Sequence, residues 1–191
     1  MKFADITTPV RAKLIAKTYK DWIKPKDNVL DIGCGNGVVS LLLKKLLKIN
    51  ITGCDREKYL IRNITYKCMV NDSTLPFNNE VFNVSMFNDV LHHTSYKNQI
   101  GLILEALRVS KRVTIFELKP TIICKFLDFT LNKIHNPRMD IPFTYRSEIK
   151  WENLFKNNNI SYKKKTVKSP IFYPFSHAAY LLTKTKTLLK S

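Results

Sequence analysis

Acidic residues are scarce in this 191-residue chain: 15 Asp and Glu stand against 32 Lys and Arg, a formal net charge of +17. The chain also has no stretch that approaches the roughly 18 apolar residues of a membrane-spanning helix. Its first ten residues, MKFADITTPV, contain no apolar segment of the kind found in a secretory signal. We therefore expect a soluble, cytoplasmic protein without a transmembrane segment.

Cysteine is also sparse, and the spacing of the cysteines does not match a metal-binding motif. The four cysteines, Cys34, Cys54, Cys68 and Cys124, occur singly, without a C-x-x-C pair and without histidines at metal-ligand spacing. This pattern excludes the usual zinc signatures and fits free thiols in a reducing compartment. The sequence predicts no metal site.

Glycine is rare, yet three of the five glycines in the chain fall in one short stretch, VLDIGCGNG. Gly33, Gly35 and Gly37 follow a short apolar run that ends at Asp31, and a helical pattern begins directly after them. Glycines at such a turn let the backbone turn tightly or approach a ligand closely. The stretch predicts a ligand-binding loop between a strand and a helix.

Strand and helix patterns alternate along the chain. Apolar runs at 28–32, 51–55, 67–70, 81–87 and 112–118 read as strands, with helical patterns at 38–48 and 98–108 between them. The first helix is expected to start at Thr8-Pro9. After Pro120, helices at 121–134 and 147–157 precede two closing strands, YKKKTV and HAAYLLT. The pattern predicts a single α/β domain over 1–191, with a mainly parallel seven-stranded sheet flanked by helices.

The acids around the glycine loop narrow the choice of ligand. Asp55 ends the second strand about twenty residues after the glycines, where a carboxylate can accept the ribose hydroxyls of an adenosine. This leaves a nicotinamide dinucleotide and S-adenosylmethionine as candidates. The G-x-G-x-G spacing and the adjacent Asp31 favour S-adenosylmethionine, because its methionine end carries an ammonium and a sulfonium.

Four stretches in this order, VLDIGCGNG, GCD, NDSTLPF and FNVSMFNDVLHHT, resemble the class I S-adenosylmethionine-dependent methyltransferases of the "methyltransferase domain 11" type. The resemblance covers residues 10–118 and implies a Rossmann-like fold. Residues 1–118 would form the N-terminal helix and the cofactor-binding half, and residues 119–191 the acceptor side and the closing strands.

The resemblance also implies roles for individual residues. The three glycines would lie under the methionine moiety, Asp31 would anchor it, and Asp55 would bind the ribose. Asp72 would accept from the adenine amino group, with the backbone of Ser73 nearby, and the backbone of Asn88 would meet the methionine amine. Arg56 would lie near the adenine edge or in solvent.

The predicted function is methyl transfer from S-adenosylmethionine to a small aromatic or lipid-like acceptor. His92 and His93, just past the fourth strand, are the candidate general bases. The stretch from Asn88 to Leu91 lacks the Pro-Pro motif of enzymes that methylate base amines, and no cysteine follows a proline as in cytosine-C5 enzymes. An RNA-directed methyltransferase and an inactive cofactor-binding protein remain alternatives.

Residues 120–160 are expected to shape the acceptor pocket. They contain aromatic side chains and two arginines suited to anions: Phe126, Phe129, Phe143, Tyr145, Trp151 and Phe155, with Arg138 and Arg146. The alternative interpretation of the aromatics is an ordinary core beneath helices. The positive charge is spread along the chain and is mostly lysine, so a nucleic-acid partner is not favoured; peripheral membrane contact and the oligomeric state stay open.

Overall fold

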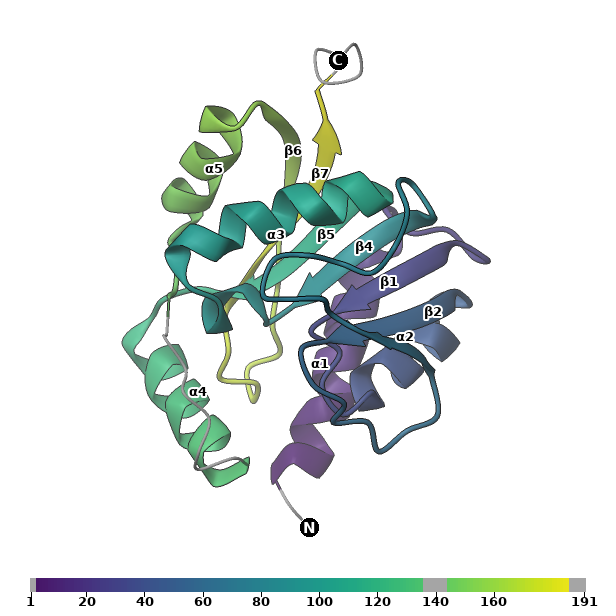
Figure 1. Cartoon of the computed structure of the whole chain (residues 1–191). Helices are drawn as coiled ribbons and strands as arrows, with labels where there is room; N and C mark the ends of the chain where they lie inside the picture. The colour runs from purple at the N-terminus through teal and green to yellow at the C-terminus, as the bar shows by residue number, and fades with distance from the viewer. Residues whose placement is uncertain (1–2, 136–143, 186–191) are drawn as a thin grey trace.

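A computed structural model describes residues 3–135 and 144–185 of the chain. Seven strands form one sheet in the order β3-β2-β1-β4-β5-β7-β6, and helices cover both of its faces (Figure 1). The strands are β1 (Asn28–Ile32), β2 (Asn50–Asp55), β3 (Thr65–Cys68), β4 (Phe82–Asn88), β5 (Ser110–Leu118), β6 (Ile160–Thr166) and β7 (His177–Lys184). The helices are α1 (Phe3–Tyr19), α2 (Val38–Leu47), α3 (Tyr96–Val109), α4 (Ile122–His135) and α5 (Glu148–Asn157), with a short 3-10 turn at Leu91–His93.

The sheet is parallel from β3 to β5 and antiparallel at β7 and β6. This confirms the predicted mainly parallel seven-stranded α/β fold. The strand order reverses between β1 and β4, and in parallel sheets ligands bind at the carboxyl ends of the strands beside such a reversal. The glycine loop follows β1 at this point.

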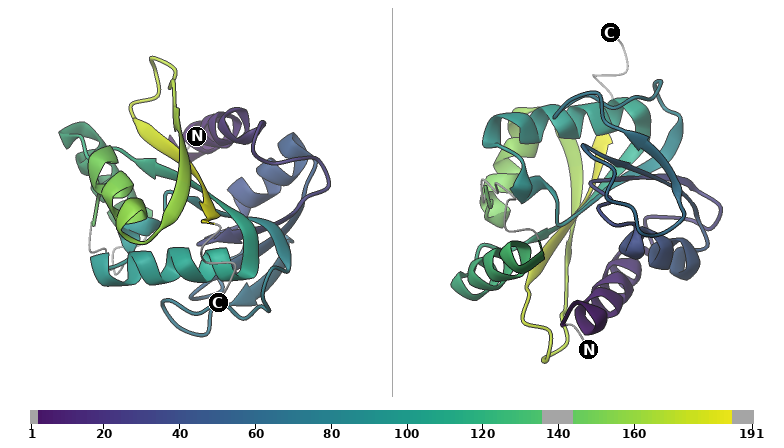
Figure 2. Two further views of the ribbon diagram at one scale, coloured as in Figure 1. Left: turned by 90° about the horizontal axis from the view of Figure 1, so that it is seen from above. Right: turned by 60° about the horizontal axis from the view of Figure 1, so that its bottom comes forward.

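Two apolar layers hold the helices to the sheet. One contains side chains of α1 and α2, such as Ile15 and Leu43, and the other contains side chains of α3 and α5, such as Ile103 and Phe155. All four are fully buried. The view from above shows the sheet between these helices (Figure 2). The strands carry near-continuous apolar runs because both faces are covered.

Most element boundaries differ from the sequence prediction by one or two residues, and two of the differences have a clear physical reason. Helix α1 begins at Phe3 and contains Pro9, so a start at Thr8-Pro9 is wrong. Proline removes one backbone hydrogen bond, but the fully buried Ala12 and Tyr19 hold the helix against the rest of the molecule. Strand β3 begins at Thr65, two residues before the expected run, because its pairing with β2 rather than its hydropathy sets its limits.

Candidate functional site

The glycine loop is built by left-handed backbone at three alternate positions. Gly33, Gly35 and Gly37 have φ angles of 73°, 52° and 76°, which residues other than glycine rarely adopt. A Cβ on Gly33 would lie 2.5 Å from a methyl carbon of Val90, so this glycine also allows close packing. A Cβ on Gly35 would meet nothing within 4 Å. The loop therefore exposes its middle glycine to open space, as a cradle for a ligand requires.

Asp55 holds this loop from the end of β2. Its carboxylate accepts hydrogen bonds from the backbone N–H groups of Gly35 and Arg56, both at 2.8 Å. Burial raises the pKa of Asp55, and these two hydrogen bonds oppose the rise. A carboxylate oxygen that accepts one hydrogen bond has room for a second. Asp55 can thus support the loop and accept a ligand hydroxyl at the same time.

Arg56 and Asp72 form an ion pair of 2.8 Å at the outer end of the same edge, and both side chains are largely exposed. Ser73 follows in a tight turn in which its N–H donates to the side chain of Asn71. Exposed ion pairs contribute less than about 1 kcal/mol. Asp72 can therefore exchange Arg56 for another donor at little cost.

Asp31 lies at the centre of a buried network beneath the glycine loop. Ser40 donates to one carboxylate oxygen at 2.6 Å and the amide of Asn88 donates to the other at 3.2 Å, while the hydroxyl of Tyr19 donates to Asn88 at 3.2 Å. Burial raises the pKa of Asp31 to about 6, against the opposing effect of its hydrogen bonds. The structure thus brings the predicted Asp31 and Asn88 together. Sequence reasoning missed Tyr19 and Ser40, which carry no motif.

Asp89 begins the loop after β4 with a φ angle of 58°. Its carboxylate lies 3.3 Å from the guanidinium of Arg11 and 3.2 Å from Nε2 of His177. Burial alone would raise the pKa of Asp89, but His177 and Arg11 outweigh it and the pKa is lowered. Side chains from α1, from the loop after β4 and from β7 thus meet at one buried carboxylate. No sequence motif signals this contact, because Arg11, Asp89 and His177 are far apart in the chain.

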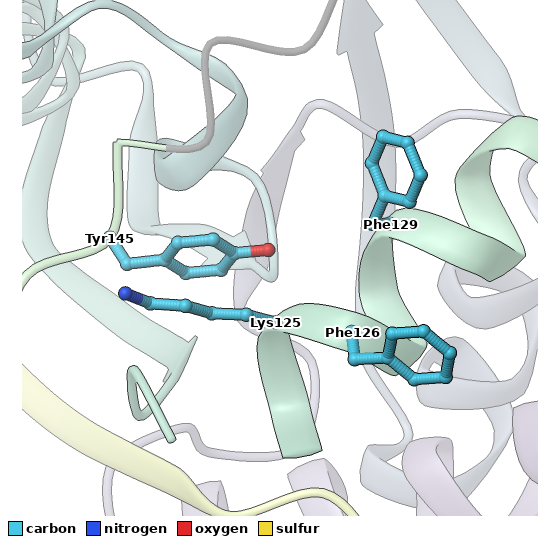
Figure 3. A pocket seen from close by; sticks show the side chains of 4 residues that line it. All are labelled: Lys125, Phe126, Phe129 and Tyr145. Carbon is cyan, nitrogen blue, oxygen red and sulfur yellow. The ribbon is translucent and has the colours of Figure 1, made fainter. Parts of the chain in front are cut away.

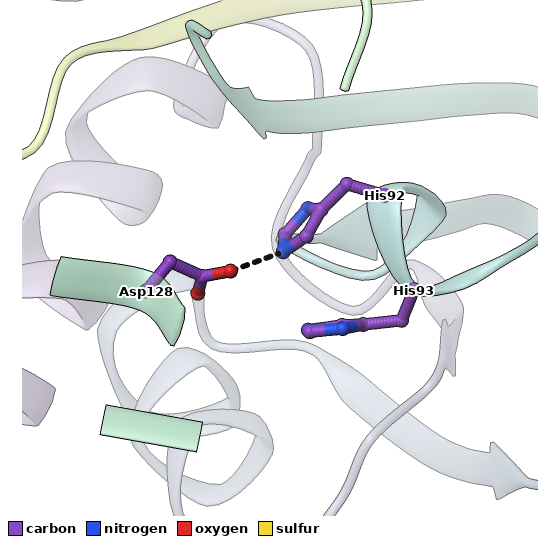
Figure 4. Close-up of side chains that lie close together, drawn as sticks. All are labelled: His92, His93 and Asp128. Atoms are coloured by element: carbon purple, nitrogen blue, oxygen red, sulfur yellow. Dashed lines mark ion pairs between the residues drawn. The ribbon is translucent and has the colours of Figure 1, made fainter. Parts of the chain in front are cut away.

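His92 is fully enclosed between two carboxylates. Its Nδ1 lies 2.7 Å from Glu117 on β5, and its Nε2 lies 3.4 Å from Asp128 on α4 (Figure 4). Burial favours the neutral ring, but Glu117 and Asp128 outweigh burial and raise the pKa of His92 to about 10. The two carboxylates therefore favour the imidazolium form of His92. Both ring nitrogens face a carboxylate, an arrangement that positions the ring, and the general-base role of His92 and His93 stays a prediction.

His93 packs beside His92, with the ring centroids 4.1 Å apart. Burial and the charge of His92 lower the pKa of His93 to about 3, so its ring is neutral. His92, His93 and Asp128 offer ligand atoms within 4.8 Å of one another, a spacing that a metal ion could use.

An open cavity of about 380 Å³ lies between α4 and the segment before α5 (Figure 3). Its lining consists of Lys125, Phe126, Phe129 and Tyr145. The ring of Tyr145 stacks on His92 with centroids 5.0 Å apart, and its hydroxyl donates to Asp128 at 2.6 Å. The cavity wall is thereby joined to the histidines after β4. A second, more polar cavity of about 450 Å³ lies along residues 58–66.

The structure divides the aromatic residues predicted for the acceptor side into two groups. Trp151 and Phe155 are buried in the core beneath α5, as the alternative interpretation expects, whereas Phe126, Phe129 and Tyr145 line the cavity. Arg146 lies over the ring of Tyr96, 4.7 Å from its centroid. Arg138 and Phe143 lie outside the described residues.

Residues 30–116 match the family described as "Methyltransferase domain". These residues include the glycine loop, Asp55, Asp72 and both histidines. Residues 30–116 form a methyltransferase domain. S-adenosylmethionine is accordingly the cofactor of this methyltransferase.

Comparison with individual proteins adds detail to this assignment. The methyltransferase is 42% identical to the ribosomal protein L11 methyltransferase of Thermosipho africanus over 45 residues, which are 24% of the chain and only 17% of that relative. The fold resembles the 1,6-didemethyltoxoflavin-N1-methyltransferase of Burkholderia thailandensis, with a TM-score of 0.68, 14% identity, and coverage of 93% and 79% of the two chains. A methyltransferase of Aquifex aeolicus aligns with a TM-score of 0.67, 14% identity, and coverage of 95% and 94%.

Proposed function

We propose that the protein transfers the methyl group of S-adenosylmethionine to a small aromatic or lipid-like acceptor. The observation that carries this proposal is the aromatic-lined cavity beside Tyr145, which is joined through Asp128 to the loop after β4. Such apolar cavities with few polar groups are typical of sites for small organic ligands. The B. thailandensis neighbour is named for methyl transfer to 1,6-didemethyltoxoflavin and was crystallised with that molecule bound.

The glycine loop and the carboxylates beside it fit the cofactor. The open side of Gly35 would give space for the methionine moiety, Asp31 and the backbone of Asn88 would hold its ammonium, and Asp55 would accept the ribose hydroxyls. Asp72 would leave Arg56 and accept from the adenine amino group, beside the backbone of Ser73. When bound, the cofactor supplies an activated methyl group, so the protein contributes mainly by holding the acceptor in line with it.

The histidines have different roles in this proposal. His92 positions the loop after β4 through Glu117, which also accepts from the backbone N–H groups of Val90 and Leu91 at 2.8 and 2.6 Å. His93 is neutral and could accept a proton, but its lowered pKa makes it a weak base, so it would serve only an acceptor that loses its proton readily. An acceptor that carries no acidic proton requires no base.

The RNA-directed alternative relies on lysine clusters, of which Lys163–Lys165 on β6 is the densest. Within this cluster, Lys164 pairs with Glu148 and Glu152, and Lys165 pairs with Asp21. Paired lysines release fewer counterions when they contact phosphates. The pairing of these lysines therefore argues against β6 as an RNA-binding surface.

The direct test is transfer of labelled methyl from S-adenosylmethionine into an extract of the native organism. We expect the label in the organic-soluble fraction, where mass spectrometry identifies the acceptor. Label that disappears on ribonuclease treatment would favour the RNA-directed alternative. Calorimetric binding of S-adenosylhomocysteine without any label transfer would favour an inactive cofactor-binding protein.

A further inference from the structure

An exposed apolar surface lies on the side of the molecule where β4 ends. We name it the apolar rim and define it by Ile122, Ile123 and Phe126 on α4, together with Ile171 and Phe172 before β7. Ile122 is 87% exposed, Phe126 67% and Phe172 73%, and Ile171 is fully exposed. Large apolar side chains grouped in this way mark a binding surface more often than an ordinary protein surface.

Helix α4 presents this surface because it has two apolar stripes. Ile122 and Phe126 are one helical turn apart and point outward, whereas Cys124, on the opposite side of the helix, is buried. The thiol of Cys124 accepts from the backbone N–H of Ser176 at 3.4 Å and contacts the carbonyl of Pro174 at 3.9 Å. These contacts place the segment that carries Ile171 and Phe172 against the Cys124 side of α4, and Ile123 lies on the helix surface between that side and the side of Ile122 and Phe126. Helix α4 and the segment before β7 both project from the end of the sheet at which β4 ends (Figure 2).

The charge around the apolar rim is positive. Lys125 on α4 and Lys168 before Ile171 are both exposed, and the ammonium of Lys125 lies over the ring of Tyr145 at the cavity mouth, 5.8 Å from the ring centroid. The only acid within residues 119–135 is Asp128, whose carboxylate is turned inward to His92 and Tyr145. The sequence contains no Asp or Glu after Glu152. An apolar face bordered by lysines is the arrangement that binds the interface of anionic membranes.

We propose that the apolar rim docks the protein on an anionic lipid bilayer. Ile122, Ile123, Ile171 and Phe172 enter the boundary between headgroups and acyl chains, while Lys125 and Lys168 face the anionic headgroups. Phe126 belongs to both the apolar rim and the cavity lining, so docking brings the cavity to the bilayer surface. An apolar acceptor can then enter from the membrane without crossing water. The docking itself goes beyond the proposed reaction and does not depend on it.

Vesicle co-sedimentation tests the docking. The full-length protein is mixed with vesicles of phosphatidylcholine alone or of phosphatidylcholine and phosphatidylglycerol in equal parts. We expect strong binding to the anionic vesicles, and a loss of about tenfold or more in the Ile122→Glu/Phe172→Glu double variant, since each large apolar side chain withdrawn from water contributes at least that factor. Raised salt should weaken wild-type binding without abolishing it, because the apolar contacts are insensitive to screening.

The matched control is Val81→Glu/Leu104→Glu, which adds the same two charges at partly exposed apolar positions before β4 and on α3, away from the apolar rim. This control should bind vesicles like the wild type, apart from a small effect of net charge. Equal binding by both double variants, or no binding by the wild type, would overturn the proposal. Binding to RNA that salt erases, without vesicle binding, would assign the charge to a nucleic acid instead. Binding of S-adenosylhomocysteine, measured on every variant, verifies folding and separates a failure of docking from a failure of the proposed reaction.

Discussion

The buried carboxyl of Asp31 should make the stability of this protein depend on pH in an unusual direction. Most native carboxylates have lowered pKa values and stabilise a protein as pH rises, whereas burial raises the pKa of Asp31 from 3.8 to about 6. The folded state therefore holds this proton more tightly than the unfolded state does. By linkage, the Asp31 contribution to the free energy of unfolding falls as pH rises from about 4 to above 6.

The size of the effect follows from the two pKa values. At 1.36 kcal/mol per pKa unit, ionised Asp31 costs the folded state about 3 kcal/mol at pH 7. Part of this cost is already present at pH 5, so about 1 kcal/mol of it develops between pH 5 and pH 7. Asp31→Asn removes the titration and keeps the shape. We therefore expect the stability of the variant, relative to the wild type, to increase by about 1 kcal/mol over this interval.

Urea unfolding of both proteins at several pH values measures this difference in stability. The loss of the hydrogen bonds to Ser40 and Asn88 adds a constant offset to the difference, so it does not affect the change of the difference with pH. Asp21→Asn is the control: a hydrogen bond from Lys165 lowers the pKa of this surface carboxylate, so its titration lies below the interval. A stability difference between Asp31→Asn and wild type that stays constant from pH 5 to pH 7 would refute the reasoning. It would mean that Asp31 remains ionised over the whole interval in the folded protein.

Two further predictions concern the cofactor and the loop after β4. Asp55→Ala should weaken binding of S-adenosylhomocysteine by roughly 1.5 to 3 kcal/mol. It should also reduce the ratio between the affinities for S-adenosylhomocysteine and for its 2′-deoxy analogue. If calorimetry finds this ratio unchanged, Asp55 does not bind the ribose, because loosening of the loop at Gly35 would weaken binding of both ligands alike. His92→Gln should destabilise the protein by about 3 kcal/mol at pH 7 by leaving Glu117 without its charged partner. The ion pair between His92 and Glu117 contributes fully to the free energy of unfolding below pH 6.5, and this contribution is lost as pH rises through about 10. Urea unfolding should therefore show the stabilities of wild type and His92→Gln converging at alkaline pH. A stability difference that stays constant would contradict the charge assigned to His92.

The elements with local signals could be predicted from the sequence. Strand β1 has the predicted limits, Asn28–Ile32, because an apolar run bounded by Asp27 and Gly33 leaves few alternatives. The glycine loop was equally clear, since three glycines in one turn have few explanations other than backbone conformation. Strand β3 was displaced by two residues because its side chains are mostly exposed and carry little hydrophobic pattern.

The partners of the site residues could not be predicted, because they depend on tertiary contacts. The sequence shows two adjacent histidines, which suggest a base, but only the fold reveals that Glu117 and Asp128 enclose His92. Similarly, nothing in the sequence links Asp89 to Arg11, 78 residues away. The spacing of residues in the sequence shows which of them share a loop or a helix. The protonation state of a side chain depends instead on neighbours from distant parts of the chain, which the folded sheet brings close.

The contrast between surface and interior bears on how the proposed reaction would proceed. The chain carries a net charge of +17, yet Asp31, Asp89 and Glu117 are buried near the carboxyl ends of the central strands. Buried carboxylates favour a cationic ligand, because charges interact more strongly where water is excluded. Methyl transfer removes the sulfonium charge of the cofactor while its ammonium stays. Asp89 and Glu117 already pair with Arg11 and His92, so Asp31 is the carboxylate that would hold S-adenosylmethionine more tightly than S-adenosylhomocysteine. The reaction itself would then weaken binding of its product and promote release.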